Sequence, residues 1–393
     1  METENITKSF NSQGTELAKN LSPVMFLTFI FFLSFVGRQL AGPLLPAIEE
    51  ELGLSHTQSG MFILLIGSGF CLSQLGAAFL AAKWGYRHCI LLSLWGSAIA
   101  ALLIGYMQSV WLLYPGFFFL GMAGGLYVPS GISLITVLVH PKDWGKAISI
   151  HELAPNLALI LVPFLATIAV ILGSWRWGFI FCAAALAALG AVYLRAGVDA
   201  DKRPSPPSLK LVGEVVAKPS FWQLSVLLSL AVGVETGVYT MTPLFLVSER
   251  GYDLAQANLL LGLSRIPSVI LVLLSGWLTD RLSPSTAISI ALGVTGVAIV
   301  CLGMGPGALL VPAIFIQAAA SACLFPPILS MASGNSSTES RALTFSLSLA
   351  VAPIVGGGLL PAGIAIAGDL LSFGAGMVGF GILTIAGVFL VKH

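Results

Sequence analysis

The chain has 393 residues, of which 57% are hydrophobic and only 9% are charged. Soluble domains carry about a quarter charged residues, so this composition excludes a soluble protein and predicts an integral membrane protein. The 18 Lys and Arg residues nearly balance the 17 Asp and Glu residues, and this balance leaves no basic surface for nucleic acid. The five cysteines lie singly within apolar runs, without the spacing of metal ligands or of a disulfide framework.

Apolar runs long enough to cross a bilayer follow one another along the chain. A spanning helix needs about 20 residues, and twelve runs meet this requirement. They lie near residues 24–48, 58–82, 88–107, 110–138, 146–172, 176–195, 221–248, 255–280, 285–304, 308–333, 341–367 and 371–391. The sequence therefore predicts an all-α membrane protein with twelve transmembrane helices.

One long polar stretch divides these helices into two groups of six. Residues 196–220 are predicted to link an N-terminal six-helix bundle (24–195), preceded by a tail (1–23), to a C-terminal six-helix bundle (221–393). Lys and Arg residues concentrate in the connections on the side of the tail and the linker. Because positively charged loops stay in the cytoplasm, we expect a multi-pass protein of the cell (inner) membrane with both termini cytoplasmic.

The two halves repeat each other faintly. Arg38 lies eight residues before Pro46, and Glu235 lies eight residues before Pro243, so the two pairs share one offset of 197 residues. Two six-helix halves related by an axis along the membrane normal are typical of secondary transporters, whose substrate path lies between the halves near the midplane.

Three segments resemble the major facilitator superfamily, namely "AFLAAKWGYR" (78–87), "GSWRWGF" (173–179) and "GWLTDRLS" (276–283). The resemblance covers essentially the whole chain. It implies two pseudo-symmetric six-helix bundles that rock around a central site, and we expect the protein to work as a monomer within the lipid bilayer.

The last of these segments matches the family's Gly-x-x-x-Asp-Arg loop. Gly276, Asp280 and Arg281 occupy its three positions, and the resemblance implies that they allow close helix contact and latch the cytoplasmic side. In the first copy of the motif Ala82 stands where the acidic residue belongs, so the inner latch of the N-terminal half departs from the family pattern.

Charged side chains inside the predicted spans are the strongest functional signal. They are Arg38 on helix 1, Glu152 on helix 5, Glu235 on helix 7 and Arg265 on helix 8, with His151 beside Glu152. A charge at mid-bilayer costs at least about 2.5–3.5 kcal/mol on insertion scales, and it usually faces a cavity or a partner. These residues are therefore candidates for a substrate path.

Two cations and one carboxylate share a level of the predicted bundle. Arg38, Glu235 and Arg265 each lie about 21–22 Å from the cytoplasmic end of their helices at 1.5 Å per residue, with Glu152 nearer that end. In the resembled family helices 1 and 7 line the cavity, which predicts that Arg38 and Glu235 face each other. The positive excess predicts an anionic substrate, because arginine grips carboxylates bidentately.

The carboxylates predict coupling to protons. An anion on the arginines neutralises the charge that favours an ionised carboxylate, so substrate binding favours proton uptake. We expect Glu235 or Glu152 to carry the proton, with His151 as a possible relay. Four further polar side chains are candidate substrate contacts: Tyr127, Asn156, Tyr239 and Gln317.

Structural explanations for the same residues remain open. Arg38 and Glu235 can form a buried ion pair that only fixes the register of the halves. Arg265 can pair with Glu152 as a lock between the halves. His151 can be a satisfied interfacial histidine, and the four polar candidates can serve as hydrogen bonds between helices.

Together these features predict a secondary active transporter that moves a small, monocarboxylate-like organic anion with protons by alternating access, and not an enzyme. The sequence has no metal-ligand cluster, nucleophile elbow or phosphate loop, so we predict neither catalytic residues nor a cofactor. "GRQLAGPLLPAI" (37–48) resembles the helix-1 arginine segment of organic-anion/proton symporters, although helix 4 lacks that subgroup's charges between Trp111 and Val139. Two alternatives stay open: a proton-driven exporter of cationic or amphipathic compounds, and a membrane sensor without transport activity.

Overall fold

The computed structural model describes residues 17–199, 203, 208–331 and 338–391, and for residues 273–280 and 338–342 it describes the backbone alone. Throughout these residues the fold is helical, without a strand. The tail and the part of the linker predicted at residues 1–16, 200–202 and 204–207 lie outside the described residues.

Six spans form the N-terminal part of the described chain. In chain order they consist of α2 (Leu17–Gln39) with α3 (Ala41–Leu52), α4 (His56–Trp84), α5 (Tyr86–Tyr106), α6 (Val110–Gly125) with α7 (Tyr127–Leu138), the short η1 (Pro141–Asp143) with α8 (Trp144–His151) and α9 (Leu153–Ile171), and α10 (Arg176–Ala196).

A short helix, α11 (Leu209–Val216), precedes the six spans of the C-terminal part. These consist of α12 (Pro219–Val232) with η2 (Gly233–Gly237) and α13 (Val238–Arg250), α14 (Leu254–Ser264) with α15 (Ile266–Arg281), α16 (Pro284–Met304), α17 (Gly307–Ala322) with α18 (Phe325–Met331), α19 (Thr338–Ile354) with η3 (Val355–Leu359) and α20 (Leu360–Leu370), and α21 (Phe373–Ala386) with η4 (Gly387–Leu390).

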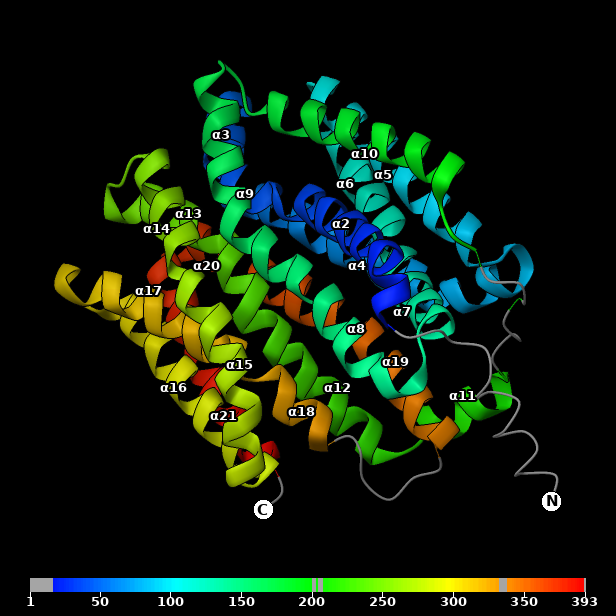
Figure 1. Cartoon of the computed structure of the whole chain (residues 1–393). Helices are drawn as coiled ribbons and strands as arrows, with labels where there is room; N and C mark the ends of the chain where they lie inside the picture. The colour runs from blue at the N-terminus through cyan, green and yellow to red at the C-terminus, as the bar shows by residue number, and fades with distance from the viewer. Residues whose placement is uncertain (1–16, 200–202, 204–207, 332–337, 392–393) are drawn as a thin grey trace, which may run out of the picture.

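Within the described residues, twelve helical stretches are long and apolar enough to cross a membrane, which confirms the predicted all-α fold. The first stretch begins at Leu17, earlier than the apolar run at residue 24, because a helix can continue into polar sequence beyond the hydrocarbon. The start of α2 and the end of the last span lie on one side of the molecule (Figure 1). We call this side the terminal face and the opposite side the far face.

The N-terminal spans fill the upper right of Figure 1 and the C-terminal spans fill the lower left. Near the far face the two parts pack closely, with α3 against α13, α9 against α14 and α4 against α20. Toward the terminal face α4 packs against α19. Among the described residues no comparable packing joins α2 to α12 or α7 to α18, so the parts are held together mainly near the far face.

Small residues permit the closest of these contacts. A Cβ atom added at Gly42 of α3 would lie 2.7 Å from the Cα atom of Thr240 on α13, and one added at Gly60 of α4 would lie 2.6 Å from the Cβ atom of Ala365 on α20. Real Cβ atoms do not approach so closely, so glycine is required for the two backbones to meet.

Proline interrupts several spans. The breaks at Leu40, Leu126 and Glu152 each lie three residues before a proline, and the break at Arg265 lies two residues before Pro267. Proline lacks the N–H that a helix needs and clashes with the preceding turn. Membrane helices tolerate such breaks where neighbouring groups satisfy the freed carbonyls or where the break lines a cavity.

Two further spans contain a π-helical turn in place of a break. These are η2 in the seventh span and η3 in the eleventh, and they pack against each other. The contact is made by glycines: a Cβ atom at Gly233 would lie 3.4 Å from the Cα atom of Gly356, and one at Gly237 would lie 2.9 Å from the carbonyl oxygen of Gly356. Such turns often occur at functional sites.

Candidate functional site

Every charge predicted inside a span lies at an irregularity of its helix. Arg38 is the penultimate residue of α2, Glu152 separates α8 from α9, Arg265 separates α14 from α15, and Glu235 is the central residue of η2. Helix interruptions near mid-membrane are where transporters form binding sites, because they expose backbone groups and open space for side chains.

Arg38 is held by aromatic rings within the N-terminal part. Its guanidinium carbon lies 4.4 Å from the centroid of the Phe70 ring and 5.1 Å from that of Phe35. A Cβ atom at Gly124 would lie 2.7 Å from the Cδ atom of Arg38, so this glycine makes room for the side chain. The Nε atom is buried without a partner, and among the described residues no carboxylate lies within 4.0 Å.

Arg38 and Glu235, which are predicted to face each other, do not contact each other directly in the structure. The contacts of Arg38 come from α2, α4 and α6 of its own half. The ion pair considered as a structural explanation is also not formed. Helix position alone predicts depth, whereas the direction of a side chain depends on how its helix is rotated and packed.

Arg265 is the most deeply buried of the four charges, with 3% of its surface exposed. Its Nη2 atom donates a hydrogen bond of 2.8 Å to the backbone carbonyl of Glu235, and its guanidinium carbon lies 5.1 Å from the centroid of the Tyr239 ring. The Nε and Nη1 atoms are buried without a partner. A guanidinium has five N–H donors, so most of its binding capacity is unused.

Glu235 contributes its backbone, not its carboxylate, to the hydrogen bond with Arg265. The half-buried carboxylate forms no hydrogen bond or ion pair with the described residues, although it interacts electrostatically with both Arg265 and Glu152. The predicted lock between Arg265 and Glu152 is likewise not formed as an ion pair within 4.0 Å. The arginine therefore remains without a carboxylate that neutralises it directly.

Side chains from neighbouring helices satisfy backbone carbonyls that the π-helical turn leaves free. Its carbonyls at Val234 and Glu235 accept hydrogen bonds from the side chains of Gln317 (Nε2, 2.5 Å) and Arg265. Gln317 is 3% exposed. The structure therefore places this predicted substrate contact beside Arg265, in a role that supports the turn.

The other polar candidates lie on two sides of this position. Tyr239 donates from its hydroxyl to the carbonyl of Leu159, 3.1 Å away on α9 of the opposite half. Asn156 donates to the carbonyl of Glu152, one helical turn earlier, at 3.0 Å. Both side chains therefore stabilise backbone near the charges, and Tyr239 also joins the two halves.

His151 and Tyr127 form a buried cluster in the N-terminal part. His151 is fully buried and stacks on Phe31 with a centroid distance of 4.6 Å, and its Nε2 atom lies 3.1 Å from the Tyr127 hydroxyl. Its Nδ1 atom lies 3.5 Å from Oε1 of Glu152, whose side chain is 50% exposed. The cluster thus connects a buried imidazole to an exposed carboxylate.

The Gly-x-x-x-Asp-Arg motif lies at the terminal end of α15. The side chain of Asp280, like residue Gly276, belongs to the segment described by its backbone alone, and Arg281 is exposed. The latch role predicted for these three residues therefore stays a prediction. Within the described residues no group of His, Cys, Asp and Glu side chains is arranged to hold a metal ion.

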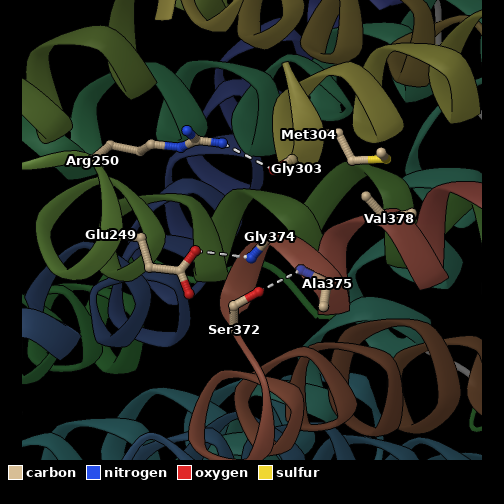
Figure 2. Close-up of a pocket in the computed structure, with 8 residues that line it drawn as sticks. All are labelled: Glu249, Arg250, Gly303, Met304, Ser372, Gly374, Ala375 and Val378. Atoms are coloured by element: carbon tan, nitrogen blue, oxygen red, sulfur yellow. Dashed lines mark hydrogen bonds between the residues drawn. The ribbon is translucent and has the colours of Figure 1, made fainter. Parts of the chain in front are cut away.

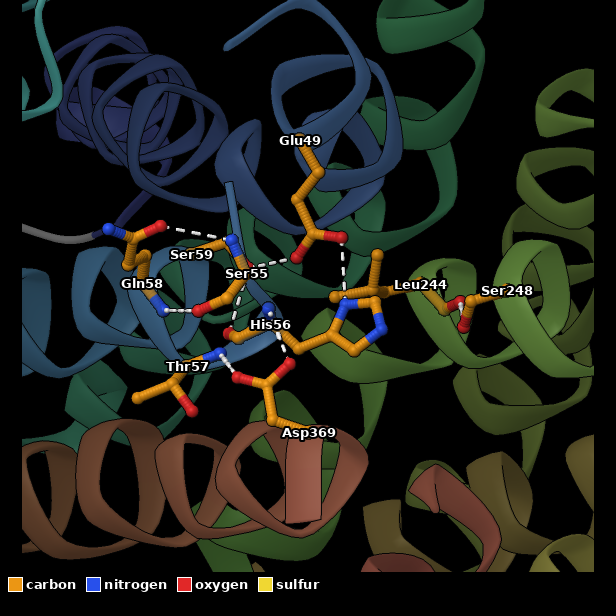
Figure 3. A network of polar contacts seen from close by, with 9 residues as sticks. All are labelled: Glu49, Ser55, His56, Thr57, Gln58, Ser59, Leu244, Ser248 and Asp369. Carbon is orange, nitrogen blue, oxygen red and sulfur yellow. Dashed lines mark hydrogen bonds and ion pairs between the residues drawn. The ribbon is translucent and has the colours of Figure 1, made fainter. Parts of the chain in front are cut away.

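A polar network at the far face was not predicted from the sequence. Asp369 of α20 accepts hydrogen bonds from the backbone N–H groups of His56 (3.1 Å) and Thr57 (2.7 Å) at the start of α4. The His56 ring contacts Glu49 through Nδ1 at 2.8 Å, and Ser59 donates to the same carboxylate. Figure 3 shows these side chains meeting between the two halves.

A second unpredicted feature is a depression of about 510 Å³ at the far face, between the ends of α13 and α16 and the start of α21 (Figure 2). Glu249 accepts from the N–H groups of Phe373 and Gly374, and Arg250 donates to the carbonyl of Gly303 at 2.9 Å. A carboxylate thus satisfies a helix N-terminus and a cation satisfies a helix C-terminus, which accounts for both charges structurally.

Residues 27–310 match the family model of the Major Facilitator Superfamily. The chain belongs to this superfamily, and the predicted resemblance is confirmed. Because the superfamily consists of transporters, this membership also confirms that the protein is not an enzyme.

Several curated proteins of this superfamily are similar to the chain. The probable sulfoacetate transporter SauU of Cupriavidus necator is 26% identical over 277 residues, which are 65% of this chain and 64% of that protein. The probable nitrate/nitrite antiporter NarK1 of Thermus thermophilus is 27% identical over 268 residues (65% and 60%). The multidrug resistance protein MdtG of Proteus mirabilis is 32% identical over 162 residues (39% and 40%). Each match spans less than two thirds of the relative's length.

Solved structures support the fold. A bacterial homologue of the human lysosomal transporter Spinster, in an inward-facing and occupied conformation, has a TM-score of 0.77 at 18% identity, over 96% of this chain and 97% of that chain. At this identity the similarity establishes the shared fold of twelve helices.

Proposed function

We propose that the protein is a secondary active transporter that moves a small organic anion of the monocarboxylate class together with protons. The observation that carries this proposal is the state of Arg265, which is 3% exposed and has two guanidinium nitrogens without partners. A buried charge without a counterion is costly, and a bound anion would supply the missing charge and acceptors.

Arg38 supports an anionic substrate from the other half. It is a second permanent cation, and its contacts among the described residues are with aromatic rings and not with a carboxylate. Within the predicted layer of Arg38, Glu235 and Arg265, the two arginines outnumber the one carboxylate and leave one positive charge in excess. An anion can bridge cations from the two halves, which would make its binding sensitive to their relative position.

The names of two relatives favour the same class of substrate, since sulfoacetate and nitrate are both small anions. The multidrug protein MdtG favours the rival reading, an exporter of cationic or amphipathic compounds. Two arginines near the proposed site oppose that reading, because they repel cations.

The proposed transport cycle is alternating access by two halves, residues 24–195 and 221–393, joined by residues 196–220. If both termini face the cytoplasm of the inner membrane, the close packing at the far face corresponds to a conformation open toward the cytoplasm. Glu235 and Glu152 are the proposed proton-carrying carboxylates, and Asp280 and Arg281 are proposed to latch the cytoplasmic side in the opposite state. We expect a single copy of the chain to carry out this cycle as a monomer.

Transport assays test this proposal. The purified full-length protein is reconstituted into liposomes, and uptake of labelled lactate, sulfoacetate and nitrate is compared with uptake of tetraphenylphosphonium, with and without an imposed pH gradient. Proton-dependent uptake of lactate, lost in Arg265→Ala, is the expected result. Uptake of the cation alone would establish the exporter, and binding of an anion without flux would establish a sensor.

A further inference from the structure

The hydrogen bonds of Tyr127 determine which nitrogen of His151 carries a proton. The Tyr127 hydroxyl is 2.5 Å from the backbone carbonyl of Leu27. A carbonyl can only accept, so the single hydroxyl proton of Tyr127 is donated there. The tyrosine oxygen must then accept from Nε2–H of His151, 3.1 Å away.

It follows that neutral His151 carries its proton on Nε2 and presents a lone pair at Nδ1. This atom is buried without a hydrogen-bond partner. The only carboxylate near it is that of Glu152, at 3.5 Å, within the part of the chain that the structure describes. Because that side chain is 50% exposed, Glu152 connects the buried lone pair to the surface of the protein.

The surroundings of His151 suit a cation that forms inside the protein. The ring of Phe31 lies parallel to the imidazole, with an interplanar angle of 8°, and an aromatic face stabilises a cation. Tyr127, on α7, and Glu152, at the start of α9, are the titratable groups that face the imidazole. Tyr193 interacts electrostatically with Tyr127, and Glu235 interacts with Glu152.

We propose that Nδ1 of His151 is the atom that holds the coupled proton, and that Glu152 delivers it. This inference rests on the proton coupling proposed above. A proton from water first binds the Glu152 carboxylate. Transfer then breaks the carboxyl O–H bond and forms an N–H bond at Nδ1, which leaves an imidazolium beside a carboxylate, while Nε2–H stays bonded to Tyr127.

The same chain of charges links this proton to the anion site. Glu152 interacts electrostatically with Glu235, and Glu235 interacts with Arg265. An anion on Arg265 adds negative charge to this row, and a proton on His151 offsets it. Proton and anion therefore favour each other's binding without sharing a contact.

Nitrogen NMR of the full-length protein, labelled with ¹⁵N-histidine, tests the assignment without any substrate. The His151 signals are identified by their loss in His151→Gln, with exposed His88→Gln as the matched control. We expect Nε2 to carry the proton of the neutral ring, and Nδ1 to take up the second proton when the sample is acidified. A proton on Nδ1 in the neutral form, or a ring that stays neutral throughout, would overturn the proposal.

A second variant tests the role of the tyrosine. Tyr127→Phe keeps the ring but removes the acceptor for Nε2–H, so the His151 signals should change from one tautomer to a mixture of two. An unchanged tautomer in this variant would contradict the hydrogen-bond argument.

Transport measurements test the coupling separately. One coupled proton and a pH gradient of one unit can drive about tenfold accumulation. His151→Gln should abolish this gradient-driven accumulation of lactate and retain lactate exchange, whereas His88→Gln should retain both. Equal loss of both activities in His151→Gln would reject the proton role. If wild-type protein transports no anion, the proposed function fails, while NMR still decides the proton assignment.

Discussion

Arg265 combines a permanent charge with almost complete burial. Its one hydrogen bond supports the carbonyl of Glu235, and the ring of Tyr239 covers part of the guanidinium. Lysine would keep the charge but lose the planar fork that matches a carboxylate. Geometry, and not charge alone, is therefore the property to test at this residue.

We predict that Arg265→Lys weakens anion binding about 10- to 150-fold, because a hydrogen bond to a charged group contributes about 1.5–3 kcal/mol. Lactate binding is measured by the ligand-dependent rise of the melting temperature. Arg195→Lys, at an exposed position in the last turn of α10, is the matched control. Unchanged binding in Arg265→Lys would remove this residue from the site.

A prediction for Arg38 can be made through its neighbour. In Gly124→Ala the new Cβ would lie 2.7 Å from Cδ of Arg38 and 2.8 Å from its Nε, so the side chain must move away from its rings. We expect reduced anion transport in a protein that still folds. At Gly76 a Cβ atom meets nothing within 4 Å, so Gly76→Ala should leave transport unchanged and stabilise its helix by about 0.5–1 kcal/mol. Equal transport by both variants would contradict a role for the Arg38 position.

At the scale of helices, the sequence predicts the spans well and their interruptions poorly. Hydrophobicity over about 20 residues identifies each span, but it is insensitive to one missing hydrogen bond inside the span. The prolines at 43, 129, 155 and 267 mark the four breaks, and three of these breaks lie at or next to a predicted site charge. A search for prolines that lie within five residues of a charge inside a span would have located these three breaks.

The π-helical turns were beyond prediction from the sequence for another reason. Their glycines are compatible with an ordinary helix, and the turns depend on contacts between spans that are far apart in the chain. Gly233 of η2 and Gly356 of η3 meet across more than a hundred residues. The contacts of the Arg38 side chain likewise depend on packing between spans, because packing sets the rotation of its helix.

The close packing of Gly356, in η3, against the seventh span gives a prediction for stability. A Cβ atom at Gly356 would lie 2.1 Å from the backbone oxygen of Ser229, and backbone cannot move aside as a side chain can. We expect Gly356→Ala to destabilise the protein by about 1–3 kcal/mol, the usual cost of overpacking. Gly363→Ala, where a Cβ atom meets nothing within 4 Å, should not destabilise it. The melting temperatures of the two purified variants provide the comparison.

At the scale of the whole molecule, the far face depends on a connection between halves. Asp369 of α20 binds two backbone N–H groups at the start of α4, so one half caps a helix of the other. Sequence reasoning missed this contact because each residue, considered alone, is an ordinary loop residue at the end of a span.

We predict that Asp369→Ala opens the far face. Loss of a helix cap costs about 0.5–2 kcal/mol, which corresponds to a change of about 2- to 30-fold in the balance between closed and open far faces. Electron spin resonance distances between labels at exposed positions 50 and 255, with the native cysteines replaced, measure this balance. Asp253 caps α14 within its own half, so Asp253→Ala should leave the distances unchanged. A similar response in both variants would show that the cap does not couple the halves.

The contact of Gly42 with Thr240 has a mechanical consequence. Two backbones that touch without an intervening side chain form a narrow pivot, about which rigid arms can swing with little rearrangement of packing. The arm formed by α2, which ends at the break beside this contact, is about 35 Å long at 1.5 Å per residue, so a swing of about 10° displaces its tip by about 6 Å. A bulkier residue at the pivot would separate the arms at their hinge and shorten that stroke.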